Sequence, residues 1–76
     1  MPDSVPEVEI TGGMIRLGQL LKYASLADTG ADAKDLLAQE QVRVNGEIEI
    51  RRGRQLVPGD TVTVGVGQHA ETVRLV

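Results

Sequence analysis

The apolar residues of this chain change their spacing at Val42, and that change limits the possible folds more than any other feature of the sequence. Before Val42 they recur every three or four residues, which is typical of helices with one buried face. From Val42 onward they alternate with polar residues, which is typical of strands with one buried face. We therefore predict an α+β fold in which two short helices pack on a small, mostly antiparallel sheet.

Two helices are expected before Val42. One face of the first helix carries four apolar residues over about two turns: Leu17, Leu20, Leu21 and Ala24. One face of the second helix carries Ala33, Leu36, Leu37 and Glu40. Asp28 or Thr29 is the expected N-cap of the second helix, because short polar side chains accept hydrogen bonds from the free N–H groups of the first turn.

Strands are expected on both sides of the helices. Residues 5–10 are predicted to form an edge strand, because Pro6 has no N–H group to donate to a neighbouring strand. A turn at 57–60 precedes a strand in which three valines share one face: Val62, Val64 and Val66. The last strand is predicted at 71–75.

The first hairpin after the helices has its turn at Asn45-Gly46. A two-residue loop would place Val44 opposite Glu47, whereas pairing the apolar residues requires a third loop residue or a bulge. We expect the apolar pairing, because the alternative exposes one set of isoleucines or valines. It joins Val44 to Ile48 and Val42 to Ile50.

The length of the chain constrains its core and its chemistry. Its 76 residues are predicted to form one domain, residues 1–76, around a core segment at 15–64. Apolar residues make up 41% of the chain and aromatic residues only 1%, so the core must be built from Leu, Ile, Val and Ala. A domain of this size leaves no room for a deep pocket. The chain has no cysteine, which excludes disulfides and thiolate metal sites.

No set of residues has the pattern of a catalytic or metal-binding site. His69 is the only histidine, and it stands in a predicted turn without a second metal ligand or a nucleophile. Ser4 and Ser25 have no base at a recognisable spacing. Tyr23 is the only tyrosine, phenylalanine or tryptophan, and we expect it to cover the helix pair rather than to stack on bases. The sequence thus predicts a protein that is not an enzyme and that uses no cofactor or metal.

The basic residues are distributed unevenly. Seven of the eight lie between Arg16 and Arg54, although the chain carries a net charge of −3. Three of them occupy a span of four positions: Arg51, Arg52 and Arg54. They form either a solvated loop balanced by Glu47 and Glu49 or a site for a polyanion, since the planar arginine group suits phosphate. Charge and spacing alone leave both interpretations open.

Five ordered segments resemble the S4-type RNA-binding domain, most closely its small stand-alone bacterial members. The segments are "RLGQLL" at 16–21, Ala33-Lys34, "VRVNGE" at 42–47, "RRGRQL" at 51–56 and "PGDTVTV" at 58–64, all within residues 15–64. In this family two helices lie against a small sheet, and RNA crosses the helices and an adjoining loop. The sequence departs from the family at Thr29-Gly30, where a Ser-Arg pair is common, and at Glu47, where a basic residue is common.

The resemblance implies a function and a set of RNA-binding residues. The implied function is non-catalytic docking on structured RNA, such as ribosomal RNA or transfer RNA. The protein would contact phosphates and recognise the shape of the RNA helix. The partner is then RNA in the ribosome or in another ribonucleoprotein. The expected binding residues are all basic: Arg16, Lys22, Lys34, Arg43, Arg51, Arg52 and Arg54.

Two other functions compete with RNA binding. A ubiquitin-like sulfur carrier also has "VNGE"-like and "PGD" segments, but its chemistry needs a C-terminal Gly-Gly where this sequence reads "VRLV". A protein-interaction module could instead dock through the acidic edge strand at Glu7 and Glu9. The first residues do not resemble a secretory signal, and the apolar runs are too short for a membrane span. We therefore expect a cytoplasmic protein without a membrane partner.

Overall fold

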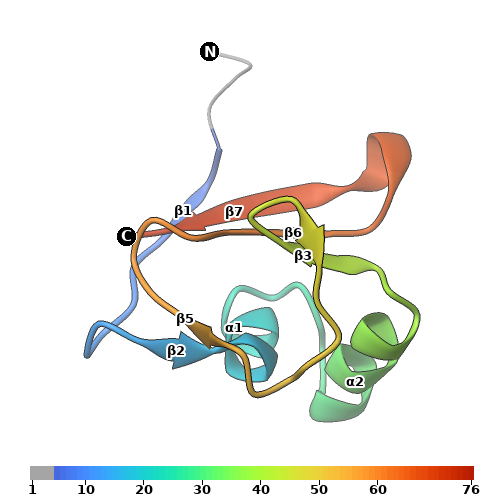
Figure 1. Ribbon diagram of the computed structural model, residues 1–76, viewed down its shortest axis with the longest axis horizontal. Helices are drawn as coiled ribbons and strands as arrows, with labels where there is room; N and C mark the ends of the chain where they lie inside the picture. The colour runs from blue at the N-terminus through green and yellow to red at the C-terminus, as the bar shows by residue number, and fades with distance from the viewer. Residues whose placement is uncertain (1–4) are drawn as a thin grey trace.

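A five-stranded sheet and two helices form two layers. The computed structural model describes residues 5–76, and Figure 1 shows both helices on the same side of the sheet. The helices are α1 (Leu17–Tyr23) and α2 (Gly30–Ala38). In spatial order the strands are β1 (Glu7–Val8), β7 (Glu71–Leu75), β6 (Thr61–Val64), β3 (Val42–Val44) and β4 (Glu47–Ile48). Only β1 and β7 run parallel, so the predicted α+β fold with a mostly antiparallel sheet is confirmed.

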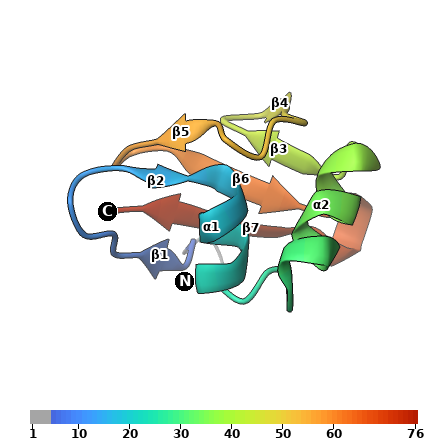
Figure 2. The same ribbon diagram turned by 90° about the horizontal axis from the view of Figure 1, so that it is seen from below.

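A separate pair of strands, which the sequence did not reveal, lies beside α1. Strand β2 (Ile15–Arg16) pairs with β5 (Gln55–Leu56) in antiparallel orientation. Figure 2 shows β2 running directly into α1 with β5 beside it. Strands of two residues are too short to display an alternating pattern, which is why periodicity misses them. A short 3₁₀ turn, η1 (Gly67–His69), joins β6 to β7.

The core lies between the two layers and contains only aliphatic residues. Three leucines of α1 are completely buried, as their spacing predicts. The edge position predicted for the first strand is also confirmed, because β1 lies at one end of the sheet. The buried apolar residues are Leu17, Leu20, Leu21, Ala27, Ala33, Leu37, Val42, Val44, Leu56, Val62, Val73 and Leu75.

Some residues lie elsewhere than their spacing suggested. Thr29 caps α2 as expected, since its Oγ1 accepts a hydrogen bond from Asp32 N at 3.1 Å. Glu40, however, lies beyond the end of the helix and is exposed, and Val66 lies beyond the end of β6 with 60% of its surface exposed. Tyr23 does not cover the helix pair, because it is 63% exposed and its Oη donates to the carbonyl of Glu9 at 3.2 Å.

The expected register of the hairpin formed by β3 and β4 is wrong. The structure pairs Val44 with Glu47 and Arg43 with Ile48, so the loop contains only Asn45-Gly46. Both loop residues have positive φ, 53° and 87°, as a tight two-residue hairpin turn requires. The local geometry of the turn therefore decides the register, and the pairing of apolar residues does not.

Side-chain hydrogen bonds hold this turn in place. Asn45 Nδ2 donates to Asp60 Oδ1 at 3.0 Å, and Asn45 Oδ1 accepts from Thr61 N at 2.9 Å. In the hairpin that this turn fixes, Ile48 and Ile50 are 49% and 61% exposed. The residue between them, Glu49, is buried instead.

Candidate functional site

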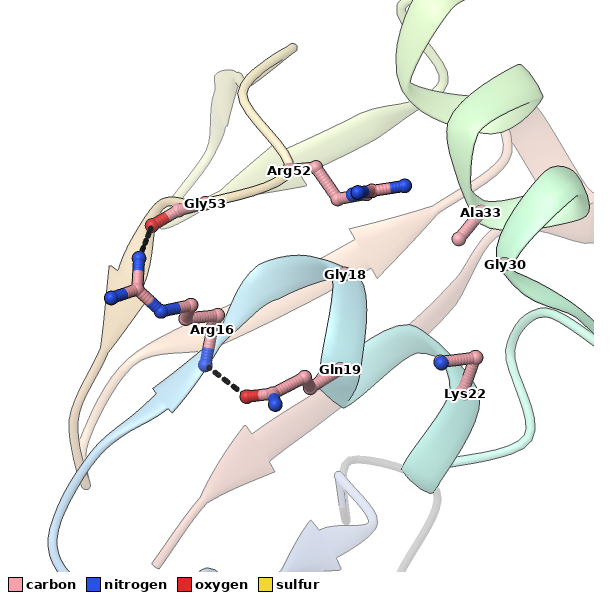
Figure 3. Close-up of a pocket in the computed structure, with 8 residues that line it drawn as sticks. All are labelled: Arg16, Gly18, Gln19, Lys22, Gly30, Ala33, Arg52 and Gly53. Carbon is pink, nitrogen blue, oxygen red and sulfur yellow. Dashed lines mark hydrogen bonds between the residues drawn. The ribbon is translucent and has the colours of Figure 1, made fainter.

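The two helices and the loop between β4 and β5 enclose a basic hollow. We call residues 49–54 the arginine loop, and we call the space between this loop, α1 and α2 the cationic hollow (Figure 3). Its volume is about 410 Å³. Three of the described residues that line it are basic and none is acidic, so the hollow suits an anion. The lining residues are Arg16, Gly18, Gln19, Lys22, Gly30, Ala33, Arg52 and Gly53.

Backbone hydrogen bonds fix the arginine loop on the start of α1. Leu17 N donates to Arg54 O at 2.8 Å, and Gly18 N donates to Arg52 O at 2.9 Å. The first N–H groups of a helix have no acceptor within the helix, so these two carbonyls satisfy them. The pairing of β2 with β5 holds the same two segments together. The backbone of Arg52 therefore has a fixed position relative to α1.

Gly18 leaves the space that the Arg52 side chain occupies. A Cβ atom at position 18 would overlap Arg52 Cγ and would lie 2.9 Å from Arg52 Cδ. Figure 3 shows the Arg52 side chain passing Gly18 and extending toward Ala33 of α2. The glycine thus allows Arg52 to lie across the hollow with its guanidinium between the helices.

Two further basic side chains reach the hollow from the α1 side. The Lys22 side chain lies in the gap between α1 and α2 in Figure 3. Arg16 turns toward the loop, because its Nη1 donates to Gly53 O at 3.4 Å. The backbone N of Arg16 donates to Gln19 Oε1 at 3.3 Å, which fixes the first turn of α1. The hollow is therefore lined by basic side chains from β2, α1 and the arginine loop.

Glu49 binds the other two arginines of the loop. Its carboxylate accepts hydrogen bonds from Arg51 Nε at 3.0 Å, from Arg51 Nη2 at 3.1 Å and from Arg54 Nη1 at 2.8 Å. The backbone N of Arg51 donates to the same carboxylate at 3.0 Å. Within residues 5–76 Glu49 forms the only two ion pairs, one with Arg51 and one with Arg54. It is also the only buried charged residue in that range. The Glu49 carboxylate thus ties both ends of the arginine loop together.

The hydrogen bonds from Arg51 and Arg54 lower the pKa of Glu49 from its ordinary value of 4.5 to about 2. Burial acts in the opposite direction and is outweighed. The Glu49 side chain is 8% exposed, whereas Arg51 and Arg54 are 72% and 35% exposed. Glu49 is therefore ionised at neutral pH, and its charge offsets part of the positive charge of the loop. Arg52 takes no part in these ion pairs.

The structure brings together four of the seven residues predicted to bind RNA. Arg16, Lys22 and Arg52 line the cationic hollow, and Lys34 lines an adjoining groove together with Arg52. Arg51 and Arg54 belong to the same loop but are paired with Glu49.

Arg43 is placed on the other face of the sheet. Its neighbours in β3, Val42 and Val44, are buried beneath the helices. Because successive side chains of a strand point to opposite faces, Arg43 points away from the hollow.

Sequence reasoning missed two residues that shape the hollow. The pairing of Val42 with Ile50 that we expected would put Glu49 on the solvent face, but Glu49 N donates to Val42 O at 2.9 Å, and cross-strand neighbours share a face. The turn at Asn45-Gly46 contained this information, because the two-residue loop that it favours puts Glu49 opposite Val42. No sequence pattern indicated the role of Gly18. Only the position of Arg52 in the structure shows why residue 18 has no side chain.

Two further findings concern residues 5–76 alone. No three histidine, cysteine, aspartate or glutamate side chains of that range come together in a way that could hold a metal ion. None of the helices in that range is long and apolar enough to cross a membrane.

Comparison with known proteins identifies relatives of the chain. The family model described as the S4 domain matches residues 8–73. The probable ribosome maturation protein RlbA of Bacillus subtilis (strain 168) is 44% identical over 57 residues, which are 75% of this chain and 80% of that protein. The putative RNA-binding protein YbcJ of Escherichia coli (strain K12) is 39% identical over 49 residues, which are 64% of this chain and 70% of that protein.

An enzyme also shares part of its sequence with this chain. The tyrosine–tRNA ligase of Thiobacillus denitrificans (strain ATCC 25259 / T1) is 37% identical over 70 residues. These residues are 90% of this chain but only 18% of the ligase. The likeness therefore concerns a small part of that enzyme.

Proposed function

The chain belongs to the S4 domain family, and from this and from its surface we propose that it is a non-catalytic RNA-binding protein. The observation that supports this most directly is the cationic hollow. It gathers Arg16, Lys22 and Arg52 without an acidic neighbour among the described lining residues, in a chain whose net charge is −3. Such a local excess of positive charge is expected of a surface that binds phosphates.

The proposed mechanism is the docking of phosphate groups into the hollow. The planar guanidinium of Arg52 can donate two parallel hydrogen bonds to one phosphate, and Lys22 supplies a second positive charge beside it. Each phosphate that is neutralised releases counterions, so affinity falls as salt is raised. Because the backbone of Arg52 is anchored on α1, the loop backbone loses little conformational freedom when RNA binds.

We propose structured RNA, and ribosomal RNA in particular, as the target. The relative named as a probable ribosome maturation protein supports this choice, because the match covers 80% of that protein. A-form RNA presents its phosphates and 2′-hydroxyl groups along a wide, shallow groove, which a fixed loop and two helices can contact by shape. Such a target places the protein in the cytoplasm with the ribosome.

The test is a comparison of two charge reversals. Arg52→Glu removes the cation that crosses the hollow, whereas Arg74→Glu makes the same change on β7, where Arg74 is exposed between the buried residues Val73 and Leu75. Binding to a paired RNA hairpin is measured by filter retention at several salt concentrations. We expect Arg52→Glu to weaken binding by at least about tenfold and to reduce the slope of log affinity against log salt by about one.

The control variant should bind within about twofold of the wild type, because Arg74 alternates with buried residues of β7 and therefore points to the face of the sheet away from the helices. Circular dichroism and thermal unfolding check that both variants keep their fold. If the two reversals weaken binding equally, or if wild-type binding does not depend on salt, the hollow is not the RNA-binding site.

A further inference from the structure

A second hollow lies on the other side of Arg52, between α2 and the arginine loop. Its volume is about 470 Å³, which is within the range of small-ligand sites. Unlike in the cationic hollow, half of the residues that line it are apolar, and we call it the apolar groove. The residues that line it are Lys34, Leu37, Ala38, Glu40, Ile50 and Arg52.

The groove forms where the chain leaves the hairpin. Strand β4 ends at Ile48, so the alternation of side chains does not extend to Ile50, which lies 61% exposed beside Leu37 and Ala38 of α2. A single exposed isoleucine is common on protein surfaces. An isoleucine that forms one wall of a groove, next to cations that have no ion pair within residues 5–76, is a more specific arrangement.

We propose that the apolar groove holds one unpaired nucleobase of an RNA whose phosphates occupy the cationic hollow. This rests on the function proposed above and adds a preference within it. Arg52 lines both hollows, so a nucleotide can place its phosphate on one side of this guanidinium and its base on the other. The preferred RNA then contains a bulged or otherwise unpaired nucleotide rather than an uninterrupted duplex.

The chemistry of the groove fits a base. Aliphatic side chains and the plane of an arginine can both pack against the face of a base, and the single tyrosine of the chain, Tyr23, is not part of the groove. Glu40 at the rim is an acceptor for the exocyclic amino groups that adenine, cytosine and guanine carry. The groove thereby offers a surface for stacking a base without an aromatic residue.

Charge also favours RNA over a second copy of the chain as the occupant. The groove carries two cations, Lys34 and Arg52, and one carboxylate, Glu40, so a symmetric dimer through this face would bring two surfaces of net positive charge together, which is unfavourable. A polyanion instead gains from both cations.

The experiment compares three RNA hairpins with the same stem: one fully paired, one with a single bulged nucleotide, and one with an abasic bulge. The variant is Ile50→Ala, and the matched control is Ile48→Ala. Ile48 is similarly exposed, but it pairs with Arg43 and therefore faces the other side of the sheet. Both substitutions are at exposed positions, so unfolding is not expected.

We expect the wild type to bind the bulged hairpin about tenfold more tightly than the other two. Ile50→Ala should remove most of this preference while keeping the affinity for the paired hairpin, and Ile48→Ala should keep both. The abasic hairpin tests the role of the base on the wild-type protein alone, whatever the variants do.

The outcomes separate the two proposals. Equal, salt-dependent binding of the wild type to all three hairpins would overturn the base-binding groove and leave RNA binding intact. Binding to none of them would overturn both. Light scattering measures the oligomeric state of Ile50→Ala. If this variant changes its oligomeric state but keeps the preference for the bulged hairpin, the groove is a protein contact and the proposal is also overturned.

Discussion

Replacing Glu49 by glutamine should destabilise the protein in a pH-dependent way. Glutamine keeps the shape of the side chain but removes the charge that binds Arg51 and Arg54. Because hydrogen bonds from the two arginines lower the pKa of Glu49 from 4.5 to about 2, folding favours the ionised form. The stabilisation is therefore fully present above pH 4.5, and it is lost as the pH falls toward 2.

The size of the effect follows from this lowering of the pKa and from the exposure of the partners. The full lowering would correspond to about 3 kcal/mol, at about 1.36 kcal/mol for each pH unit. Arg51 is 72% exposed, so water and salt screen its contact with Glu49. We therefore expect Glu49→Gln to lower the free energy of unfolding at pH 7 by about 1–2 kcal/mol. For a domain of this length the melting temperature falls by about 4–8 °C for each kcal/mol.

The assay is urea unfolding of the wild type and of two variants at a series of pH values. Glu47→Gln is the control, because Glu47 belongs to the same hairpin but is exposed and has no ion pair within residues 5–76. It should change the free energy of unfolding by less than about 0.5 kcal/mol. The difference between the wild type and Glu49→Gln should shrink as the pH is lowered from 5 toward 2. A difference that is no larger than that of the control, or that is the same at both ends of this range, would refute the reasoning.

Two further predictions concern the positions of Arg52 and Arg43. Gly18→Ala should weaken RNA binding several-fold, since the new Cβ displaces the Arg52 side chain. Its free energy of unfolding should change by less than about 1 kcal/mol, because the preference of alanine for the helix offsets the cost of moving the Arg52 side chain. Calorimetry together with filter binding checks both, and an unchanged affinity would show that Arg52 need not lie where the structure has it. Arg43→Glu should leave the affinity for RNA within about twofold of the wild type, because the side chain points away from the hollow. If it instead loses as much affinity as Arg52→Glu, measured on the same RNA, the binding surface covers both faces of the sheet.

The fold was predictable from the sequence where the pattern is local. The leucines of α1 recur at helical spacing and are buried, and the apolar residues of β6 and β7 alternate with polar residues as strands require. The register of the β3–β4 hairpin was predicted wrongly, because two local signals disagreed and the apolar pattern was preferred to the turn. A two-residue turn with positive φ at Asn45-Gly46 is geometrically rigid, whereas two exposed isoleucines cost the fold little.

The candidate site was less predictable than the fold. From the sequence alone, reversing the charges of Arg51, Arg52 and Arg54 together is expected to abolish RNA binding and leave the fold intact. In the structure two of these arginines neutralise Glu49, so their reversal would place two more carboxylates beside a buried one. Arg52 alone is the cleaner variant. Its separation from the other two depends on Gly18 and on backbone contacts between distant segments, which no local pattern encodes.

Helix α2 separates two acidic residues of the chain from the basic residues that line the cationic hollow and the apolar groove. Gly30, Ala33 and Lys34 of this helix line the cationic hollow or the apolar groove, whereas Asp32 and Asp35 line a third hollow together with residues before and after them. Successive residues of a helix are rotated by about 100° around its axis, so these two sets point to opposite sides of the helix. With its side chains a helix is about 10–12 Å across, and the Debye length is about 8 Å at physiological ionic strength. The aspartates are thus largely screened from an RNA in the hollow at that salt concentration. At low salt they are not screened, so their repulsion grows together with the attraction of Arg52 and Lys22, and Asp32→Asn should raise the affinity more at low salt than at physiological salt.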